Sequence, residues 1–506
     1  MNEHRTADFA ERKLSLAILA AVLGLVAIGA GLAEAREQTI IGLRGRDAAG
    51  LRALVVAQQD PASPQYRRWI TAGEFGRRFG AAPRELKRVE RWLRAGGCRV
   101  KRFTGRQQVT CVDGRPGDVP AALRSLVEDV LDPTAPLTLR FALAQPRSVA
   151  SDGAFYLSPA EYAAFFGFDR LYAAGIDGSG QRIGIVGVAG VDPANITAFR
   201  DFFSLPPLDL EQVGAEPPLP PNSDAQMNAQ MEAFLDVTWA GAVAPGAGVV
   251  LSLSDGRLVD AIGRLVDRSD VSVISLSVVL IPAPASSPFI RQARRLFRQA
   301  ATQGKTVLIA SGDLGPVLTV SRKGKVTRGV DPMTASPFVT AVGGTTPKAQ
   351  QSAVAAYSDE EVWQQGPNAS GGGPSHMSRP SWQRGRPTRT VPDVSLLAAP
   401  VYPIALNGVF DPLNLNLVGG TSAAAPSWAG LVAMLNQQRG APVGLLNPAL
   451  YALGRAQAQG GVAVFHDIVL GSNTTTLARG FPAKVGYDLA TGWGTPDVPA
   501  LFAAFP

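Results

Sequence analysis

Short apolar segments that alternate with helical patterns constrain the fold of this chain more than any other feature. They begin with QRIGIVGVAG at residue 181 and continue with GVVLSLS, VSVISLSVV, KTVLIASGD and SPFVTAVGG. Strands without a polar alternation are typical of a parallel sheet that helices cover on both faces. We therefore predict an α/β fold with a largely parallel sheet flanked by helices. We expect its functional side chains at the carboxyl ends of the strands.

The residues before this region have a different pattern. Between residue 36 and about residue 140, the helical stretch PRELKRVERWLRAGG stands among hairpin-like strands, which predicts a small α+β unit. The segment RFALAQPRSVASDGAF at residues 140–155 is typical of a linker. We therefore divide the chain after residue 35 into two units, residues 36–146 and residues 147–506.

The first 35 residues form a third region. Three cationic residues precede an uncharged, mainly apolar run over residues 14–32, and the tripeptide AEA at 33–35 has the small-x-small form of a signal-peptidase site. We predict a signal peptide over residues 1–35 and a secreted, extracellular protein that begins at Arg36. A retained membrane anchor is the alternative, because the run is nearly long enough to span a bilayer. A periplasmic location is also open.

Positive charge is concentrated in the unit that follows. Residues 36–146 hold 20 Lys and Arg against 11 Asp and Glu, whereas the net charge of the whole chain is +7. A basic segment beside a nearly neutral one fits a detachable partner better than a nucleic-acid binder. The sequence contains no zinc-finger, RNP or heptad pattern. We therefore expect no nucleic-acid partner.

Both cysteines lie in the same unit, in CRVKRFTGRQQVTC. Cys98 and Cys111 are symmetric about Thr104-Gly105, so a hairpin that turns there places them opposite each other, within reach of a disulfide. Export from the cytoplasm makes oxidation feasible. A pair of buried free thiols is an equal alternative.

A serine stands at a sharp turn near the C-terminal end of the chain. Two glycines, a Thr-Ser pair, small residues and a proline precede a helical pattern in VGGTSAAAPSWAGLVAML at 418–435, as in the serine turn of a subtilisin. Such a serine needs a base, which is a histidine in subtilisins. None of the three histidines, His4, His376 and His466, lies in a setting that suggests a base for Ser422. The alternative is that Ser422 caps the helix.

A pair of carboxylates offers another base. The segment AQMNAQMEAFLDVTWAGAVA at 225–244 is helical in pattern, and its only charged residues are Glu232 and Asp236. Four residues apart, they lie on one helix face, where like charges are destabilising. Apolar neighbours raise the pKa of a carboxyl group and make it a usable base or acid. The alternative is two solvated surface carboxylates.

A third acid follows a predicted strand. In KTVLIASGDLGP the strand ends at Ala310, and a glycine-flanked turn places Asp313 at its carboxyl end. A carboxylic acid that stays protonated there could donate a hydrogen bond to a developing oxyanion. The alternative is a turn or helix-capping residue.

Together these motifs resemble the sedolisins, or serine-carboxyl peptidases, a family with a subtilisin-like fold that includes kumamolisin. ExxxD occurs in MEAFLDV, SGDxG in ASGDLG and GTSAxxP in GGTSAAAP, in the family's order. The match extends to DPMTASPFVTAVGGT, RPSWQ, VPDVS and GYDLATGWGTPD. The segment QQDPASPQYRRWITAGEFGRRFG resembles the family's activation domain, so the resemblance spans nearly the whole chain after residue 36.

The resemblance implies a role for each residue of the site. Ser422 would be the nucleophile, Glu232 the general base and acid, Asp236 the group that orients and polarises Glu232, and Asp313 the acid of an oxyanion hole beside the Ser422 N–H. Residues 36–146 would be a prodomain that assists folding and inhibits the peptidase domain. We expect a monomeric, acid-acting endopeptidase made as a zymogen, with proteins and peptides as substrates. The rival is a secreted binding protein that keeps the fold without the activity.

The resemblance also implies one structural calcium ion near the C-terminus. Asp467 and Asp488 match the family's carboxylate ligands, and the backbone carbonyls of Ile468, Lys484 and Gly486 match the others; such an oxygen-only ligand set suits a hard cation. Lys484 departs from the family, which usually has glycine there. The alternative for Asp488 is a turn residue.

Two further expectations concern the substrate groove and the prodomain. Val278-Val279 in VISLSVV replaces an aromatic residue and a glycine that commonly follow the second serine in the family, which should alter peptide preference. Arginines of the basic N-terminal unit could pair with carboxylates of the peptidase domain. Acid would protonate those carboxylates and weaken the pairs.

Overall fold

The structure, a computed structural model, describes most of the chain after residue 37. The described ranges are 25–28, 38–131, 137–141, 147–148, 155–217, 219–221, 223–255, 258–281, 286–321, 324–348, 356–406 and 408–506. The expected signal-peptidase site, the first 24 residues and most of the expected linker lie outside these ranges. Within the expected signal segment, Leu25–Ile28 form strand β1. No helix in the described ranges is long and apolar enough to cross a membrane.

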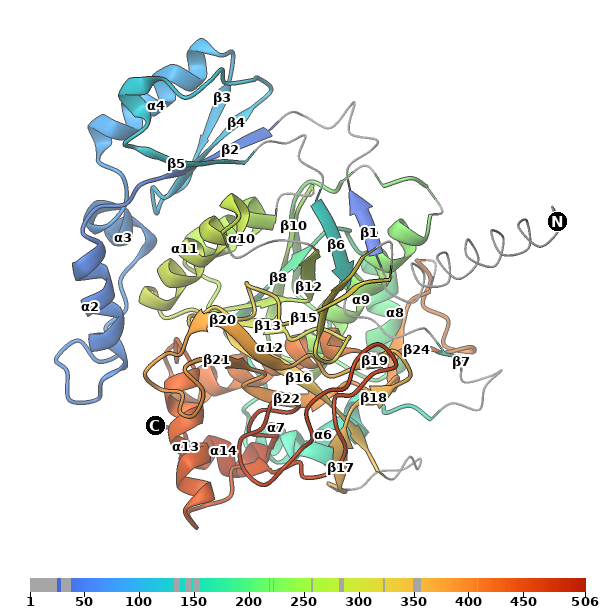
Figure 1. The fold of residues 1–506 in the computed structure, drawn as a ribbon. Helices are drawn as coiled ribbons and strands as arrows, with labels where there is room; N and C mark the ends of the chain where they lie inside the picture. The colour runs from blue at the N-terminus through green and yellow to red at the C-terminus, as the bar shows by residue number, and fades with distance from the viewer. Residues whose placement is uncertain are drawn as a thin grey trace, which may run out of the picture.

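Residues 38–131, which we call the N-terminal unit, form the predicted small α+β structure (Figure 1). Its antiparallel sheet has the strand order β3-β4-β2-β5. Helix α4 (Pro83–Ala95) begins at a proline, which suits the first helical turn, and buries Val89 and Leu93 against the sheet. The other elements are β2 (Gln38–Leu43), α2 (Ala48–Gln59), α3 (Ala72–Arg78), β3 (Arg99–Arg102), β4 (Gln108–Val112), η1 (Ala121–Leu123) and β5 (Val127–Leu131).

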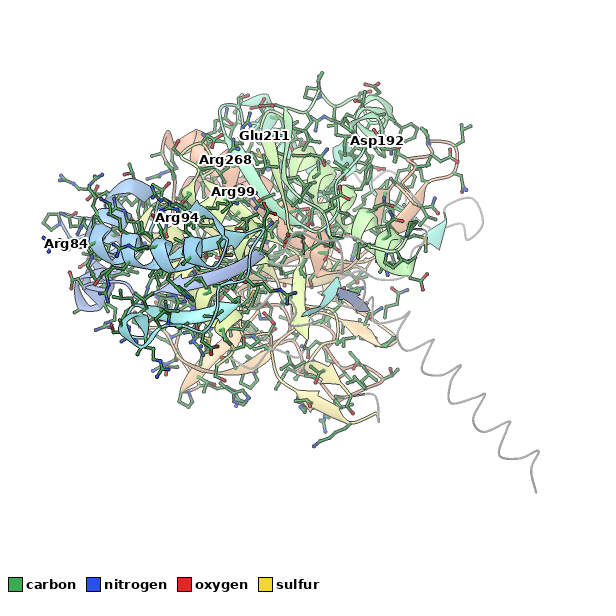
Figure 2. All side chains as sticks on the ribbon, turned by 90° about the horizontal axis from the view of Figure 1, so that it is seen from above. Arg84, Arg94, Arg99, Asp192, Glu211 and Arg268 are labelled. Atoms are coloured by element: carbon green, nitrogen blue, oxygen red, sulfur yellow. A yellow bond between two sulfur atoms is a disulfide. The ribbon has the colours of Figure 1, made fainter. Side chains whose placement is uncertain are left out.

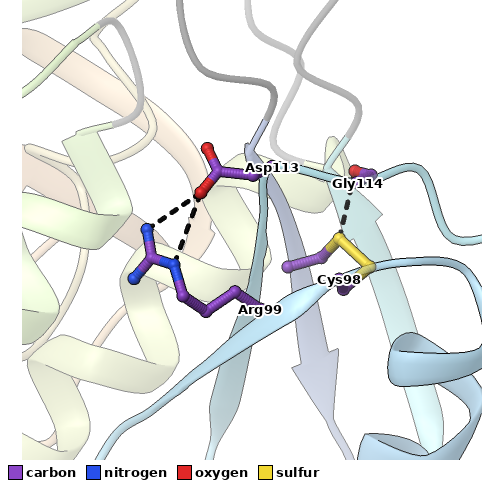
Figure 3. Close-up of a disulfide and its surroundings, with 5 residues drawn as sticks. Cys98, Arg99, Asp113 and Gly114 are labelled. Carbon is purple, nitrogen blue, oxygen red and sulfur yellow. Dashed lines mark hydrogen bonds and ion pairs between the residues drawn. A yellow bond between two sulfur atoms is a disulfide. The ribbon is translucent and has the colours of Figure 1, made fainter.

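Cys98 and Cys111 form a disulfide across the β3–β4 hairpin (Figure 3). The register pairs Val100 with Cys111, so the hairpin is centred one residue later than the sequence symmetry predicts. The two cysteines are therefore diagonal rather than directly opposite, yet within bonding distance. Arg99 and Asp113 form an ion pair beside them (3.1 Å). Of the two alternatives that the sequence left open, the structure has the disulfide, and the free-thiol alternative is wrong.

The C-terminal unit, residues 155–506, is built on an eight-stranded sheet of order β17-β16-β13-β11-β8-β10-β9, with β22 paired to β16. All of its pairings are parallel except that of β17 with β16. The predicted α/β class is confirmed. The strands are β8 (Arg182–Gly187), β9 (Leu210–Gly214), β10 (Gly248–Leu253), β11 (Val273–Leu276), β13 (Thr306–Ala310), β16 (Thr340–Pro347), β17 (Glu360–Val362) and β22 (Val394–Leu397).

Helices cover both faces of this sheet. Along β13, Leu308 and Ala310 pack with α9 (Asp224–Val243) and α12 (Thr421–Arg439), whereas Val307 and Ile309 pack with α10 (Leu258–Asp267) and α11 (Pro288–Thr302). This alternation explains the uninterrupted apolar strands of the sequence, because both faces are buried. The remaining helices are α6 (Pro159–Phe166), α7 (Phe168–Ala173), α8 (Pro193–Phe202), α13 (Asn447–Ala458) and α14 (Val498–Ala504).

Short strands form the smaller sheets around this core. They are β1 with β6 (Leu137–Phe141) and β12 (Val278–Ile281); β14 (Val317–Val320) with β15 (Val326–Arg328); β18 (Gln364–Gln365) with β19 (Asn368–Ala369); β20 (Gly373–Ser378) with β21 (Thr388–Val391); β7 (Arg147–Ser148) with β24 (Asn416–Val418) and β23 (Tyr402–Ile404); and β25 (Phe465–His466) with β26 (Thr495–Pro496).

The two units meet along α11, which contacts α2, α3 and β5 (Figure 1). Charged contacts at this interface have the opposite polarity to the predicted one. Asp129 and Glu128 of the N-terminal unit accept hydrogen bonds from Arg295 of α11 (2.5 Å each), and Asp129 also accepts one from Arg291 (3.1 Å). Lys101 supplies the one pair of the predicted polarity among the described residues, with Asp260 (3.0 Å).

These ion pairs run the other way from the expected pairing of N-terminal arginines with carboxylates of the neighbouring unit, so the expectation is wrong for these contacts. Figure 2 shows Arg84, Arg94 and Arg99 on the N-terminal unit, and all three are exposed. Arg94 pairs with Glu90 of the same unit (3.5 Å), so part of the positive charge is balanced within the unit itself. The sequence gives the amount of charge, but only the fold decides which residues face the interface.

Uncharged amides form a second set of contacts at the interface. Gln107 donates to Gln299 (2.7 Å), and Gln292 donates to Gln108 (2.6 Å). All four side chains are buried. Each amide both donates and accepts, so these pairs link the units without any ionisable group.

Candidate active site

Helix α9 presents two carboxyl groups to the interior of the C-terminal unit. Ser223 caps its N-terminus by accepting from the Gln226 N–H, and the helix is buried from Met231 to Val243. Glu232 is 3% exposed and Asp236 is 1% exposed. The predicted helix is confirmed, and the alternative of two solvated surface carboxylates is wrong.

Ser422 lies in the first turn of α12, which packs against α9. The N-cap of α12 is Gly420, whose φ of 124° lies outside the range that side-chain-bearing residues readily adopt. Ser422 is thus the second residue of the helix, and the alternative of a capping serine is wrong. Its side chain is fully buried, and its Oγ donates to the backbone oxygen of Ser277 (3.3 Å).

Ser277 connects the two helices. It follows strand β11 at its carboxyl end, and its Oγ donates a 2.7 Å hydrogen bond to Oδ1 of Asp236. Sequence reasoning mentioned this serine only as the neighbour of Val278-Val279 and gave it no role. Its position directly after an apolar strand was a signal that could have found it, because side chains at such positions gather at one edge of a parallel sheet.

Asp313 lies at the same edge, three residues after β13. Its Oδ1 accepts hydrogen bonds from the Thr421 backbone N–H (2.9 Å) and from the Thr421 hydroxyl (2.8 Å). The Thr421 hydroxyl in turn accepts from the Gly312 N–H (3.0 Å). Asp313 is 4% exposed. These contacts fix the turn after β13 to the start of α12, so the predicted capping role for Asp313 is present in the structure.

Burial dominates the electrostatics of the site. It raises the pKa of Glu232 well above its ordinary value, and the nearby Asp236 carboxyl raises this pKa further. The hydroxyls of Ser422 and Ser277 oppose that shift. Burial likewise raises the pKa of Asp236, and the Ser277 hydroxyl opposes the rise. Two interacting carboxyls of this kind bind and release protons as a pair.

Among the described residues, no donor is placed to form a hydrogen bond with either carboxyl oxygen of Glu232. A buried carboxyl group normally has such partners, because an unsatisfied polar group is costly. Glu232 therefore combines a raised pKa with free acceptor positions beside a serine hydroxyl. This arrangement can take up and return a proton.

Comparisons with known proteins agree with this geometry. Residues 33–127 match the model of the pro-kumamolisin activation domain. Kumamolisin from Bacillus sp. (strain MN-32) is 34% identical over 358 residues, which cover 64% of this chain and 60% of that protein. Sedolisin from Pseudomonas sp. (strain 101) is 26% identical over 525 residues, which cover 92% of this chain and 86% of that protein. The chain is similar to members of the sedolisin family.

The fold supports the same assignment. The solved structure of Pseudomonas sedolisin, a serine-carboxyl proteinase complexed with two molecules of pseudo-iodotyrostatin, superposes with a TM-score of 0.59 at 27% identity. The superposition covers 69% of this chain and 98% of that chain. Members of the family are peptidases and hence hydrolases.

Strands β6 and β7, which overlap the expected linker, pair with backbone beside the site. Strand β6 pairs antiparallel with β12, which directly follows Ser277, and Phe141 lies opposite Val278. Strand β7 pairs with β24, which leads into α12, and Arg147 lies opposite Leu417. The described parts of the backbone between the two units therefore pair with β12, which follows Ser277, and with β24, which leads to Ser422.

The two described histidines lie elsewhere. His376 is exposed on β20, and His466 stacks on Tyr357 with ring centroids 3.5 Å apart. His4 lies outside the described residues. Within the described ranges, no hydrogen bond or ring contact joins a histidine to Ser422. The geometry thus favours Glu232 over a histidine as the base.

The residues expected to bind calcium converge on one loop. Oδ2 of Asp467 accepts from the Gly486 N–H (2.7 Å), and Oδ2 of Asp488 accepts from the Lys484 N–H (3.1 Å). Burial raises the pKa of Asp467, and it raises that of Asp488 to about 6. The Lys484 side chain is exposed, and Ile468 is buried.

This loop fits a hard cation by its donor chemistry. Two carboxylates lie beside a short backbone segment, and hard cations take carboxylate and backbone carbonyl oxygens as ligands. Asp488 also accepts from the N–H groups of Ala490 and Thr491 (2.8 Å each), so the predicted alternative, a turn residue, describes part of its role. The described residues contain no cluster of three or more His, Cys, Asp or Glu side chains that could hold a metal. The expected set has only two carboxylates and depends on backbone oxygens.

Proposed function

We propose that this chain is the precursor of a serine-carboxyl endopeptidase that hydrolyses peptide bonds in acid. The observation that carries the proposal is the buried Glu232 carboxyl, which has a raised pKa and lies near the Ser422 hydroxyl. A general base works best when its pKa lies near the pH of the reaction. The kumamolisin alignment spans 60% of that relative's length, and the motif order supports carrying the activity to this chain.

Acylation begins when Oγ of Ser422 attacks the carbonyl carbon of the scissile bond. Glu232 removes the Oγ proton as the new C–O bond forms, and then gives this proton to the leaving amine as the C–N bond breaks. An ester on Ser422 results. Water hydrolyses the ester in the second half of the reaction, with Glu232 again taking and returning a proton. The Asp236 carboxyl accepts a hydrogen bond from Ser277, and it binds and releases protons together with Glu232.

The developing oxyanion is stabilised by two donors. One is the backbone N–H of Ser422, which belongs to the first helical turn, where N–H groups lack intrahelical partners. The other is the protonated carboxyl of Asp313, whose Oδ1 is held by Thr421 next to the serine. A donor in such a place stabilises the transition state more than the ground state.

Acid pH follows from these roles. Asp313 must keep its proton to donate a hydrogen bond, so activity falls as the pH rises past the value at which that proton leaves. Glu232 must be able to accept a proton, so activity also falls at very low pH. We therefore expect a bell-shaped profile with its maximum in the acidic range.

The prodomain, which includes the N-terminal unit and strand β6, acts as an intramolecular inhibitor. The antiparallel pairing of β6 with β12 supports this role, because an extended chain that adds to a sheet edge uses the same backbone groups that a peptide substrate would use. We place the prodomain at residues 36–146 and the peptidase domain at residues 147–506. The substitution of Val278-Val279 in this strand alters peptide preference rather than the reaction.

One calcium ion stabilises the C-terminal loops. Asp467 and Asp488 would hold it together with the carbonyl oxygens of Ile468, Lys484 and Gly486. The exposed Lys484 side chain leaves its own carbonyl available, but its positive charge lowers the affinity. The ion contributes structure and takes no part in the reaction.

The protein acts as a monomer outside the cytoplasm, after removal of residues 1–35. N-terminal sequencing of the exported protein tests this part of the proposal. Recovery of residues before Arg36 would contradict cleavage and favour a membrane anchor.

The decisive experiment measures hydrolysis of a denatured protein by the purified precursor from acidic to neutral pH. Glu232→Gln and Ser422→Ala should each abolish cleavage, whereas Ser427→Ala, farther along α12, and Asp224→Asn, at the exposed start of α9, should retain it. Cleavage with a maximum above neutral pH would contradict the mechanism. Absence of cleavage at every pH, even after removal of the N-terminal unit, would favour the binding-protein alternative.

A further inference from the structure

Trp69 of the N-terminal unit lies against two glycines of the C-terminal unit. A Cβ atom at Gly304 would come within 2.5 Å of Cγ of the indole, and a Cβ atom at Gly444 would come within 2.6 Å of Cη2. Gly304 thus faces the five-membered ring and Gly444 the six-membered ring. Any larger residue at either position would displace the indole.

The polar edge of the indole is also bound. Its Nε1–H donates to the backbone oxygen of Pro442 (3.0 Å). Gly444 is itself held in place, because its backbone oxygen accepts from the Thr306 hydroxyl (2.5 Å). We call the surface formed by Gly304, Pro442 and Gly444 the indole slot. It matches tryptophan, which combines a large apolar ring with a single N–H donor.

Neighbouring backbone contacts support the same docking. The carbonyl of Thr302, at the C-terminal end of α11, accepts from the Ile70 N–H (3.1 Å) and from the Gln58 side chain (3.1 Å). Carbonyls in the last turn of a helix lack partners within the helix. The N-terminal unit therefore supplies hydrogen bonds that this end of α11 needs.

The indole slot lies far from the catalytic residues. Ser422 lies in the first turn of the 19-residue helix α12, whereas Gly444 follows the end of this helix at Arg439, which is about 26 Å from Ser422 along the helix axis. Likewise Gly304 precedes the amino end of β13, and Asp313 follows its carboxyl end. The slot is thus at the opposite edge of the sheet from the site.

We propose that the indole slot is a recognition site that anchors the prodomain through Trp69, independently of the substrate groove. Its ligand is a tryptophan side chain on an extended peptide segment, here that of the prodomain itself. Cleavage of the linker leaves this anchor intact, so the prodomain stays bound until the slot also releases it. The part of this inference that concerns release of the prodomain rests on the proposed function. The contact between Trp69 and the indole slot can be measured without catalysis.

The test uses the full chain with Ser422→Ala, which prevents self-cleavage, and measures backbone hydrogen exchange at neutral pH. The reporter is segment 103–106, because the N–H groups of Thr104 and Gly105 donate to Asp267 of the other unit. Trp69→Ala should speed exchange there by about 30-fold or more, the loss typical of an interface hot spot. Gly304→Ala and Gly444→Ala should give at least about a tenfold increase.

The matched control is Gly440→Ala. Gly440 also has a positive φ (63°), but no atom lies within 4 Å of a Cβ built there, so the backbone strain is the same without contact with an indole. Exchange at 103–106 should stay at the parent rate. Strands β8 and β13 should stay protected in every variant, which shows that the C-terminal unit is folded.

Parent-like exchange at 103–106 in Trp69→Ala and in both slot variants would overturn the proposal. An equal increase in Gly440→Ala would also overturn it. If Trp69→Ala fails to fold, the slot variants carry the test, since they leave the N-terminal unit unchanged. Because no peptide is hydrolysed in this experiment, its outcome is independent of whether the proposed peptidase activity is found.

Discussion

The Ser277 hydroxyl lies 2.7 Å from Oδ1 of Asp236 and donates a hydrogen bond to it. This contact ties the end of strand β11 to helix α9, one turn from Glu232. Burial raises the pKa of Asp236. The Ser277 hydroxyl opposes this rise, so the hydrogen bond favours the ionised form of the Asp236 carboxyl. Ser277 is therefore a positioning residue for the carboxyl pair.

Ser277→Ala should reduce kcat by roughly 10-fold or more, the value of a lost hydrogen bond to a charged group. Loss of the hydroxyl also raises the pKa values of Glu232 and Asp236, so the acidic limb of the pH–rate profile should move to higher pH. Ser275→Ala is the control, since Ser275 is buried on the same strand and its Oγ has no partner among the described residues. An unchanged profile in Ser277→Ala would contradict the positioning role.

Asp313→Ala should reduce turnover on the order of 10²-fold, because the oxyanion loses a donor. Asp313→Asn is more informative. An amide can accept from Thr421 and donate to the oxyanion without a titratable proton. Activity of this variant should therefore extend to higher pH than that of the parent enzyme. A basic limb that stays in place would show that another group sets it.

Glu360 provides a test of pH-dependent stability away from the site. It is buried, it accepts from the hydroxyls of Thr345 and Thr495, and burial raises its pKa from 4.5 to about 7. The folded state therefore holds a proton that the unfolded state releases above about pH 4.5. Its contribution to stability is complete below that pH and is lost as the pH rises through about 7.

Between pH 4.5 and 7, the free energy of unfolding should fall by up to about 3 kcal/mol less in Glu360→Gln than in the parent. Urea unfolding of the Ser422→Ala chain at several pH values measures this. A pH slope equal to that of the parent would mean that Glu360 is ionised throughout.

Calcium affinity should depend steeply on pH. Burial raises the pKa of Asp488 to about 6, so below this pH a proton competes with the cation for the carboxylate. We expect the affinity to fall about tenfold for each unit below pH 6, as measured by calorimetry on the Ser422→Ala chain. Asp488→Asn should abolish binding, and Lys484→Gly should strengthen it. A Tm that chelation leaves unchanged at neutral pH would contradict the predicted calcium site.

Asp129→Asn should make the prodomain easier to release. The Asp129 side chain is fully buried and pairs with Arg291 and Arg295, so neutralising it removes the counter-charge of Arg291 and leaves Arg295 with Glu128 alone. Self-processing should then begin at a higher pH than in the parent. Asp118→Asn, an exposed change on the same unit, should have no effect. Processing of Asp129→Asn at the parent's pH would show that this ion pair does not gate release.

Sequence patterns predicted those helices and strands whose apolar pattern matches their buried position in the fold. The strand at 306–310 is apolar because both faces are buried, and the helix around Glu232 could be predicted because its apolar length leaves few other structures. The hairpin turn was misplaced by one residue, because the symmetry of two cysteines does not fix a register. Register depends on pairing with β2, which lies far away in the sequence.

Contacts between distant elements account for the rest. Ser277 acquires its partner only when β11 and α9 come together. The polarity of the interface pairs could not be predicted from the net charge of the N-terminal unit, since the residues that pair with Arg295 of α11 are Glu128 and Asp129. Trp69 likewise stands in a segment that resembles an activation domain, and only the fold places it against Gly304 and Gly444.

The buried glutamine pairs between the units, Gln107 with Gln299 and Gln108 with Gln292, contain no group that titrates. One of these residues also reaches the charged contacts, because Arg295 donates to Oε1 of Gln292 (3.0 Å) as well as to Asp129 (2.5 Å). Arg295 thus joins the amide pairs and the ion pairs into one network across the interface. A substitution at Asp129 therefore reaches the amide contacts through the guanidinium that both share.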